Sequence, residues 1–151
     1  MTAFMTAEFE ILAVLNRYLH GVDTRDRDKV AACFTEDAEA AYHGDTGGCR
    51  SRDEILNLID KAGAFSGAHV GASMHALGSW AIELRDGVSA RSSSMVEAVH
   101  VDLPRGSGRG VRRGLRYTDE FRKTDAGWLI CRRRHQLLWS YPVENATLSP
   151  K

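Results

Sequence analysis

The sequence has few cysteines, no net charge and no long apolar run, and each shortage argues against a class of protein. Its three cysteines, Cys33, Cys49 and Cys131, lie far apart and form no CxxC pair, so a disulfide framework is not expected. Twenty basic residues balance twenty acidic ones, whereas a protein built mainly to hold nucleic acid is normally basic. No apolar run is long enough for a membrane span, and no secretory signal pattern opens the sequence. We therefore expect a cytoplasmic protein without nucleic-acid or membrane partners.

Motifs for metal binding, phosphate binding and nucleophilic serines are missing as well. The six histidines include no HExxH or HxH arrangement of the kind that holds zinc. The segment GDTGGCRS, which starts at Gly44, lacks the Gly-Lys-Ser/Thr ending of a phosphate loop. No GxSxG nucleophile elbow occurs. We therefore expect no metal site.

The spacing of apolar residues changes from a helical period in the first half of the chain to a period of two in the second. After Thr6, a candidate N-cap, apolar residues recur every three or four positions and predict a helix that ends near Gly21. Asp26 is expected to cap a second helix that runs through Phe34, and Ser51 opens a third helix through a capping box. Strands are predicted over residues 38–42, 73–84, 88–101, 111–123 and 128–139.

This order of elements predicts a single α+β domain over residues 1–151. Turn sequences such as Asp86-Gly87 join the later strands into hairpins, so the sheet is expected to be antiparallel. Three N-terminal helices would cover one face of the curved sheet. A curved sheet with a covering helix forms a cone, and its mouth is a pocket for a small molecule.

Asp23 and His75 are the first candidates for catalysis. Asp23 follows the C-terminal end of the first helix, where the helix dipole disfavours a carboxylate, and Asp26 is the better cap for the next helix. From this stretch alone a structural and a functional role for Asp23 are equally open. His75 lies among small and apolar residues near the start of a strand, where a buried structural histidine is the ordinary interpretation. An imidazole beside a carboxylate, however, gains basicity and a fixed tautomer, which suits a general base.

Other polar residues fall on apolar faces of the predicted elements. Tyr18, Tyr42 and Tyr117 do so, and buried tyrosines need a hydrogen-bond partner from the core or from a ligand. His100 ends a strand and alternates with small and apolar residues, although an exposed histidine at a strand end is the simpler interpretation of that residue alone.

Four consecutive basic residues occupy the last predicted strand. Arg132 and Arg134 alternate with Trp128 and Ile130. If that face points inward, an arginine there needs an acidic partner or a substrate oxygen, because an unpaired buried charge is costly. If that face points outward, Arg133 and His135 point inward instead, and the sequence leaves this choice open.

The order and spacing of these motifs resemble the SnoaL-like family of the nuclear-transport-factor-2-like superfamily. The opening similarity consists of Tyr18, the stretch Gly21-Val22-Asp23 and the segment Phe34-Thr35-Glu36-Asp37-Ala38. The closing similarity consists of Asp119-Glu120-Phe121, then Asp125-Ala126-Gly127-Trp128 and finally Trp139. Together they cover roughly residues 7–142 and imply the cone-shaped fold.

Within this superfamily the chain is most similar to the branch of scytalone dehydratase, hexachlorocyclohexane dehydrochlorinase and bile-acid dehydratase. Those enzymes remove water or HCl from a ring with a histidine that an aspartate holds. The resemblance implies that Asp23 and His75 form the catalytic pair and that no cofactor takes part. It implies further catalytic roles for three residues: Tyr18, Tyr42 and His100. Two residues are implied in substrate binding: Tyr117 and Arg132.

The resulting hypothesis is a cofactor-free lyase of the dehydratase type that acts by general acid–base catalysis on a small hydrophobic cyclic or polyketide-like substrate. A cyclase or isomerase would use the same pair, whereas a non-catalytic binding or assembly module would keep only the cone. Nucleic-acid binding through the arginine-rich segment 105–113 is a weaker alternative. By resemblance we also expect a homo-oligomer, dimer or trimer, built on an outer sheet face that includes Trp80 and Ile82.

Overall fold

The computed structural model describes residues 3–44, 47–65, 71–102 and 108–147. Within them the chain forms three helices and five strands, with the helices concentrated in the first half. The helices are α1 (Ala3–Asp23), α2 (Arg27–Ala31) and α3 (Arg52–Lys61). The strands are β1 (Phe34–Ala41), β2 (Ala72–Leu84), β3 (Ser89–Asp102), β4 (Arg109–Thr124) and β5 (Gly127–Val143).

Two of the three predicted helix starts agree with the structure. The Asp26 carboxylate accepts a hydrogen bond from the backbone N–H of Lys29 at 2.9 Å and caps α2. The Ser51 hydroxyl oxygen accepts a hydrogen bond from the backbone N–H of Glu54 at 3.2 Å and caps α3. Thr6 does not cap α1, because that helix already begins at Ala3.

The second helix is shorter than predicted. It ends at Ala31, and Phe34 opens β1 rather than closing the helix. Phe34 lies opposite Ile130 of β5, so pairing with a distant strand overrides the local helical pattern.

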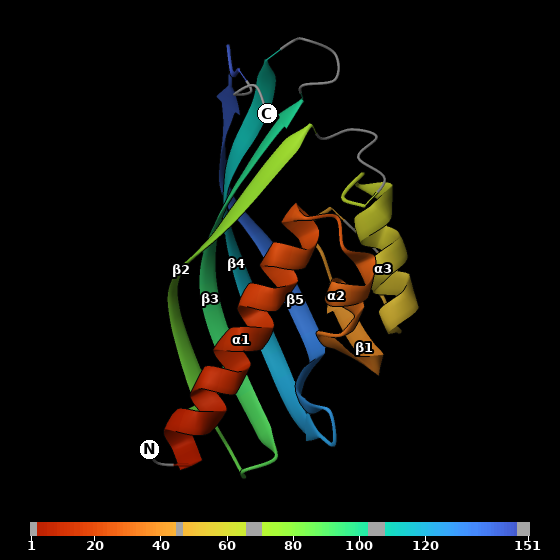
Figure 1. Cartoon of the computed structure of the whole chain (residues 1–151), viewed down its shortest axis with the longest axis vertical. Coiled ribbons are helices and arrows are strands. Elements are labelled where there is room, and N and C mark those ends of the chain that lie inside the picture. Colours follow the sequence, from red (N-terminus) through yellow and green to blue (C-terminus); the bar gives the residue numbers. More distant parts are fainter. Residues whose placement is uncertain (1–2, 45–46, 66–70, 103–107, 148–151) are drawn as a thin grey trace.

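The sheet has the strand order β1-β5-β4-β3-β2. The neighbours from β2 to β5 pair in antiparallel fashion, as predicted, whereas β1 runs parallel to β5. Figure 1 shows the long strands curving around α1, with α2 and α3 beside it. The α+β fold with N-terminal helices over a curved sheet is thus confirmed, with one parallel strand at its edge.

The core lies between α1 and the inner face of the sheet. Ile11 of α1, Phe34 of β1, Phe121 of β4 and Ile130 of β5 are each no more than 1% exposed. The sheet also buries two charged residues among these apolar side chains, Asp119 and Arg133, and these two pair with each other.

A close contact between α1 and α2 fixes the end of the first helix. A Cβ added at Gly21 would lie only 2.8 Å from Cγ2 of Val30. Glycine at this position lets α2 pack directly against α1, two residues before Asp23. The glycine therefore serves close packing rather than ending the helix, which continues to Asp23.

A β-bulge in β2 changes which side chains face the core. Leu77 lies opposite Val96 and Trp80 opposite Ser94, so two residues of β2 face one residue of β3. The extra residue reverses the inward face of the strand. Ile82 consequently packs against the core, whereas Trp80 stays 41% exposed. Trp80 lies opposite the buried Ser94 and Ile82 opposite the buried Ser92, so both residues follow the inward side of β2, and neither belongs to the outer sheet face on which the sequence placed them.

None of the helices in the described ranges has both the length and the apolar character that a bilayer span requires.

Candidate active site

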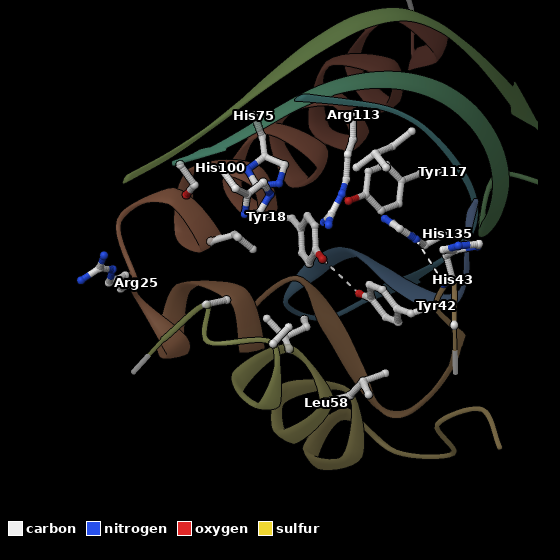
Figure 2. Close-up of a pocket in the computed structure, with 17 residues that line it drawn as sticks. Tyr18, Arg25, Tyr42, His43, Leu58, His75, His100, Arg113, Tyr117 and His135 are labelled. Carbon is white, nitrogen blue, oxygen red and sulfur yellow. Dashed lines mark hydrogen bonds between the residues drawn. The ribbon is translucent and has the colours of Figure 1, made fainter. Parts of the chain in front are cut away.

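A cavity of about 440 Å³ opens between the helices and the inner face of the sheet. Figure 2 shows the side chains that line it. Five residues that the sequence singled out are among them: Tyr18, Tyr42, His75, His100 and Tyr117. They come from α1, the residue after β1, and the strands β2, β3 and β4, so segments far apart in the sequence converge on one cavity.

Asp23 and His75 form a hydrogen-bonded pair at the wall of this cavity. Oδ1 of Asp23 lies 2.6 Å from Nδ1 of His75, and Oδ2 accepts a hydrogen bond from the backbone N–H of His75 at 2.7 Å. The two contacts fix both the ring and the strand that carries it. A carboxylate can only accept at Nδ1, so the proton of a neutral His75 lies on Nδ1. Nε2 then carries the lone pair, and it has no hydrogen-bond partner in the described part of the chain.

A third contact completes the surroundings of the Asp23 carboxylate. The Ser73 hydroxyl donates a hydrogen bond to Oδ1 at 2.8 Å. Burial would raise the pKa of Asp23, but the hydrogen bond and charge of the His75 ring, the backbone N–H of His75 and the Ser73 hydroxyl together lower it below its usual value. Asp23 is therefore ionised at neutral pH and stabilises a positive charge on His75.

His100 stands beside His75 in the cavity. Their ring centroids are 5.2 Å apart, with the rings nearly perpendicular. Burial, followed by the nearby charges of His75 and Arg113, lowers the pKa of His100 to about 4. His100 is thus a neutral imidazole at neutral pH, and it can donate one hydrogen bond without adding a charge.

Two tyrosine hydroxyls meet on the opposite side of the cavity. The hydroxyl oxygens of Tyr18 and Tyr42 lie 3.0 Å apart, and Figure 2 shows them pointing toward each other. Burial raises the pKa of Tyr42 well above its usual value, and the neighbouring Tyr18 raises it further. Tyr42 therefore keeps its proton at neutral pH. If one hydroxyl donates to the other, the second hydroxyl retains a proton for a ligand oxygen.

A buried arginine packs against two tyrosines of the cavity, Tyr18 and Tyr117. The Arg133 guanidinium lies 4.0 Å from the ring centre of Tyr18 and 4.4 Å from that of Tyr117. It also forms a bidentate ion pair with Asp119, at 2.7 Å and 2.8 Å. Asp119 offsets the cost of burial and keeps the pKa of Arg133 well above its usual value. The pair holds the two rings in place with cation–π contacts.

The prediction that Arg132 contacts the substrate is wrong, because its side chain points away from the cavity. Its side chain is 59% exposed and pairs with Glu39 and Glu120. The reason is a β-bulge in β5: Glu120 lies opposite Arg132 and Phe121 opposite Ile130, which leaves Cys131 as an extra residue. The bulge reverses the inward face after Ile130. Arg133 and His135 point inward, which is the alternative that the sequence left open.

Other polar residues that line the cavity were not named as site candidates: Arg25, His43, Ser73 and Arg113. His135, which was one of the two open alternatives for the last strand, lines it as well. Alternation contained the signal for Ser73 and Arg113, since Ser73 shares a face with His75, and Arg113 shares one with Leu115 and Tyr117. His135 accepts a hydrogen bond at Nδ1 from the backbone N–H of His43 at 3.3 Å, so its Nε2 carries the proton.

The described residues contain no cluster of three or more histidine, cysteine, aspartate or glutamate side chains arranged to hold a metal ion. The acid–base groups above are the chemistry that the cavity displays.

Comparison with known proteins agrees with this architecture. Residues 4–134 match the SnoaL-like domain. No curated protein matches the sequence significantly. Among solved structures, the hexachlorocyclohexane dehydrochlorinase LinA-type3 from Novosphingobium barchaimii LL02 superposes with a TM-score of 0.82 at 16% identity, covering 99% of this chain and 98% of that one.

Two solved structures from Novosphingobium aromaticivorans have a similar fold. A candidate scytalone dehydratase has a TM-score of 0.81 at 20% identity, covering 99% of this chain and 98% of that one. A candidate aromatic ring hydroxylase has a TM-score of 0.79 at 25% identity, covering 92% of this chain and 94% of that one. The similarity to the dehydrochlorinase, at 16% identity, and to the candidate scytalone dehydratase, at 20% identity, shows a shared fold.

Proposed function

The chain belongs to the SnoaL-like domain family, and we propose that it acts as a cofactor-free, dehydratase-type lyase on a small hydrophobic cyclic or polyketide-like substrate. One observation carries the proposal: an aspartate holds Nδ1 of His75 at 2.6 Å while the same ring lines an open cavity. A general base requires this combination of a fixed tautomer, a stabilised cationic form and access to a substrate. Two structural neighbours are named as elimination enzymes, a dehydrochlorinase and a candidate dehydratase.

The first step is proton abstraction by Nε2 of His75 from a carbon next to a substrate carbonyl. The C–H electron pair moves onto the carbonyl oxygen and forms an enolate. Asp23 stabilises the imidazolium that results, because its carboxylate accepts a hydrogen bond from Nδ1–H, with Oδ1 2.6 Å from Nδ1. A hydroxyl of the Tyr18–Tyr42 pair donates a hydrogen bond to the developing oxyanion, where a preorganised donor contributes most.

The second step is loss of water. The enolate electrons form the carbon–carbon double bond, and the bond between the neighbouring carbon and its hydroxyl breaks. The imidazolium of His75 returns its proton to the departing hydroxyl, so His75 is neutral again at the end of the cycle. His100 donates a hydrogen bond to the leaving oxygen as a neutral imidazole, since its pKa of about 4 leaves it uncharged at neutral pH.

The shape of the cavity suits this substrate class. Val22, Leu58 and Leu115 contribute apolar wall, whereas the sheet residues named above and the tyrosine pair contribute polar groups. A volume of about 440 Å³ lies in the range of sites that enclose a small organic ligand. The open cavity and the intact pair favour catalysis over a binding module that has only kept the cone.

The test is product analysis with a panel of hydroxylated cyclic ketones. We expect mass spectrometry to detect loss of water with the natural protein and no turnover with His75→Gln. His20→Gln is the matched control, because His20 lies on the exposed side of α1. Products of unchanged mass would replace the lyase with an isomerase or cyclase that uses the same pair. Equal turnover by His75→Gln would contradict the mechanism altogether.

A further inference from the structure

The cavity contains an arginine that the mechanism above does not use. Arg113 lines the cavity from β4, and Figure 2 shows its side chain extending from the sheet toward the space between His100 and Tyr117. The preceding residue, Arg112, has a different environment. It points outward and forms a bidentate ion pair with Glu97, at 2.8 Å and 2.9 Å. Arg113 is only half buried, so its side chain stays in contact with solvent and does not need an acidic partner inside the protein.

Within the part of the chain that the structure describes, the Arg113 guanidinium has no hydrogen-bond or ion-pair partner. No aspartate or glutamate is found among the described lining residues either. Asp23 stands behind His75, and its oxygens are already occupied by Ser73 and His75. The cavity therefore presents an uncompensated positive charge to whatever enters it.

A second donor, His135, lines the same cavity as Arg113. The backbone N–H of His43 donates to Nδ1 of His135, so the remaining ring proton of His135 lies on Nε2. Burial and then the charge of Arg133 are the main causes of the low pKa of His135, about 4, and Arg113 lowers it further. Arg113 has the same effect on His100 after burial and His75. The Arg113 charge thus lies within electrostatic reach of both imidazoles.

We propose that Arg113, assisted by Nε2–H of His135, binds a carboxylate on the substrate, so that the natural substrate is a hydrophobic ring acid rather than a neutral ring compound. A guanidinium and a carboxylate form charge-assisted hydrogen bonds, frequently in bidentate geometry. The carboxylate supplies the partner that Arg113 lacks inside the protein. This inference rests on the proposed lyase function for its substrate, but the binding that it predicts requires no turnover.

The experiment uses two probes of the same shape, 2-naphthoate and 2-naphthamide, in calorimetric titrations at constant ionic strength and neutral pH. We expect the natural protein to bind the carboxylate about tenfold to a hundredfold more tightly than the amide, the range of one charge-assisted hydrogen bond. Arg113→Gln should lose this preference and keep its affinity for the amide. Arg113→Lys should retain part of the preference, since it keeps the charge without the planar donor pair.

Arg112→Gln is the matched control, because it removes the neighbouring charge from the outer face of the same strand. It should leave the preference unchanged, and thermal unfolding of all variants checks that they fold. Equal binding of the two probes, binding of neither, or a preference that survives in Arg113→Gln would overturn the inference.

The outcome is separable from that of the proposed function. A carboxylate preference without any dehydration would contradict the proposed lyase function and support the acid-binding site. Dehydration of neutral ketones without a carboxylate preference would contradict the acid-binding site alone.

Discussion

Oδ1 of Asp23 lies 2.6 Å from Nδ1 of His75, although 52 positions separate the two residues in the sequence. The last residue of α1 meets the fourth residue of β2 at this point. Ser73, two residues earlier on the same strand, donates to the same carboxylate oxygen. The pair is thus held by the helix end and the strand together.

Removal of the Asp23 charge should slow the reaction without unfolding the protein. Asp23→Asn keeps the size of the side chain but no longer stabilises an imidazolium, so kcat should fall about a hundredfold to ten-thousandfold. Steady-state kinetics with any substrate found in the ketone screen measures this. Asp37→Asn is the control, because Asp37 is exposed and pairs with Arg122. A loss of kcat in both variants would contradict a specific role for Asp23.

The Tyr18 and Tyr42 hydroxyls should act as one unit. Because they lie 3.0 Å apart, removal of either one disturbs the donor that remains. We expect Tyr18→Phe and Tyr42→Phe each to lower kcat by about tenfold to a hundredfold. The double variant should lose much less than the product of the two single effects. Fully multiplicative losses in this double-mutant cycle would show that the two hydroxyls act independently.

The stability of the protein should decrease in mildly acidic solution. Burial is the main cause that lowers the pKa of His100 and His135 to about 4, from an ordinary value of 6.5. Between pH 6.5 and pH 4 the unfolded chain therefore binds more protons than the folded one. The contribution of each histidine to the free energy of unfolding is fully present above pH 6.5 and is lost as the pH falls toward 4. It is on the order of 3 kcal/mol per histidine.

Urea unfolding at several pH values across this window measures the effect. His100→Gln removes one of the two groups, so its free energy of unfolding should depend less steeply on pH than that of the natural protein. Carboxylates that titrate in the same range are common to both proteins and cancel in the comparison. Identical slopes would mean that the pKa of His100 is not lowered by folding.

Arg132 and Arg133 should differ sharply in their effect on stability, although they are adjacent. Arg133→Met leaves the Asp119 carboxylate buried without its partner, which costs about 3–5 kcal/mol. Arg132→Met breaks only exposed ion pairs and should cost less than about 1 kcal/mol. Urea unfolding at neutral pH compares the two. If Asp119→Leu combined with Arg133→Met restores stability, the cost arises from the unpaired charge; a loss as large as in the single variant would point to packing instead.

A methyl group at Gly21 should push the two first helices apart. Its Cβ would approach Cγ2 of Val30 to 2.8 Å, and overpacking of this kind costs about 1–3 kcal/mol. Since Asp23 follows two residues later, Gly21→Ala should lower kcat as well as the free energy of unfolding. Ala32→Gly at the exposed end of α2 is a useful comparison, because it changes the same connection without a clash. Unchanged stability of Gly21→Ala would show that α2 shifts freely.

The sequence determined much of the fold because local rules operate where the chain is regular. Alternation located β2 to β5, and the caps Asp26 and Ser51 began the helices that they were expected to begin. The position of Asp23 after the first helix, together with the family resemblance, made Asp23 and His75 candidates, although only the structure shows their contact. What alternation cannot determine is a bulge, since one extra residue reverses every later side chain.

The tertiary structure decided the rest for that reason. The extra residue Cys131 placed Arg133 rather than Arg132 under the tyrosines, and the bulge after Leu77 turned Ile82 into the core. Pairing with β5 converted Phe34 from a helical residue into the start of a strand. The tertiary structure likewise placed Asp23 beside His75 and placed no described acidic residue in the cavity with Arg113. A sequence can name ionisable residues, but only the folded chain determines which of them have a partner.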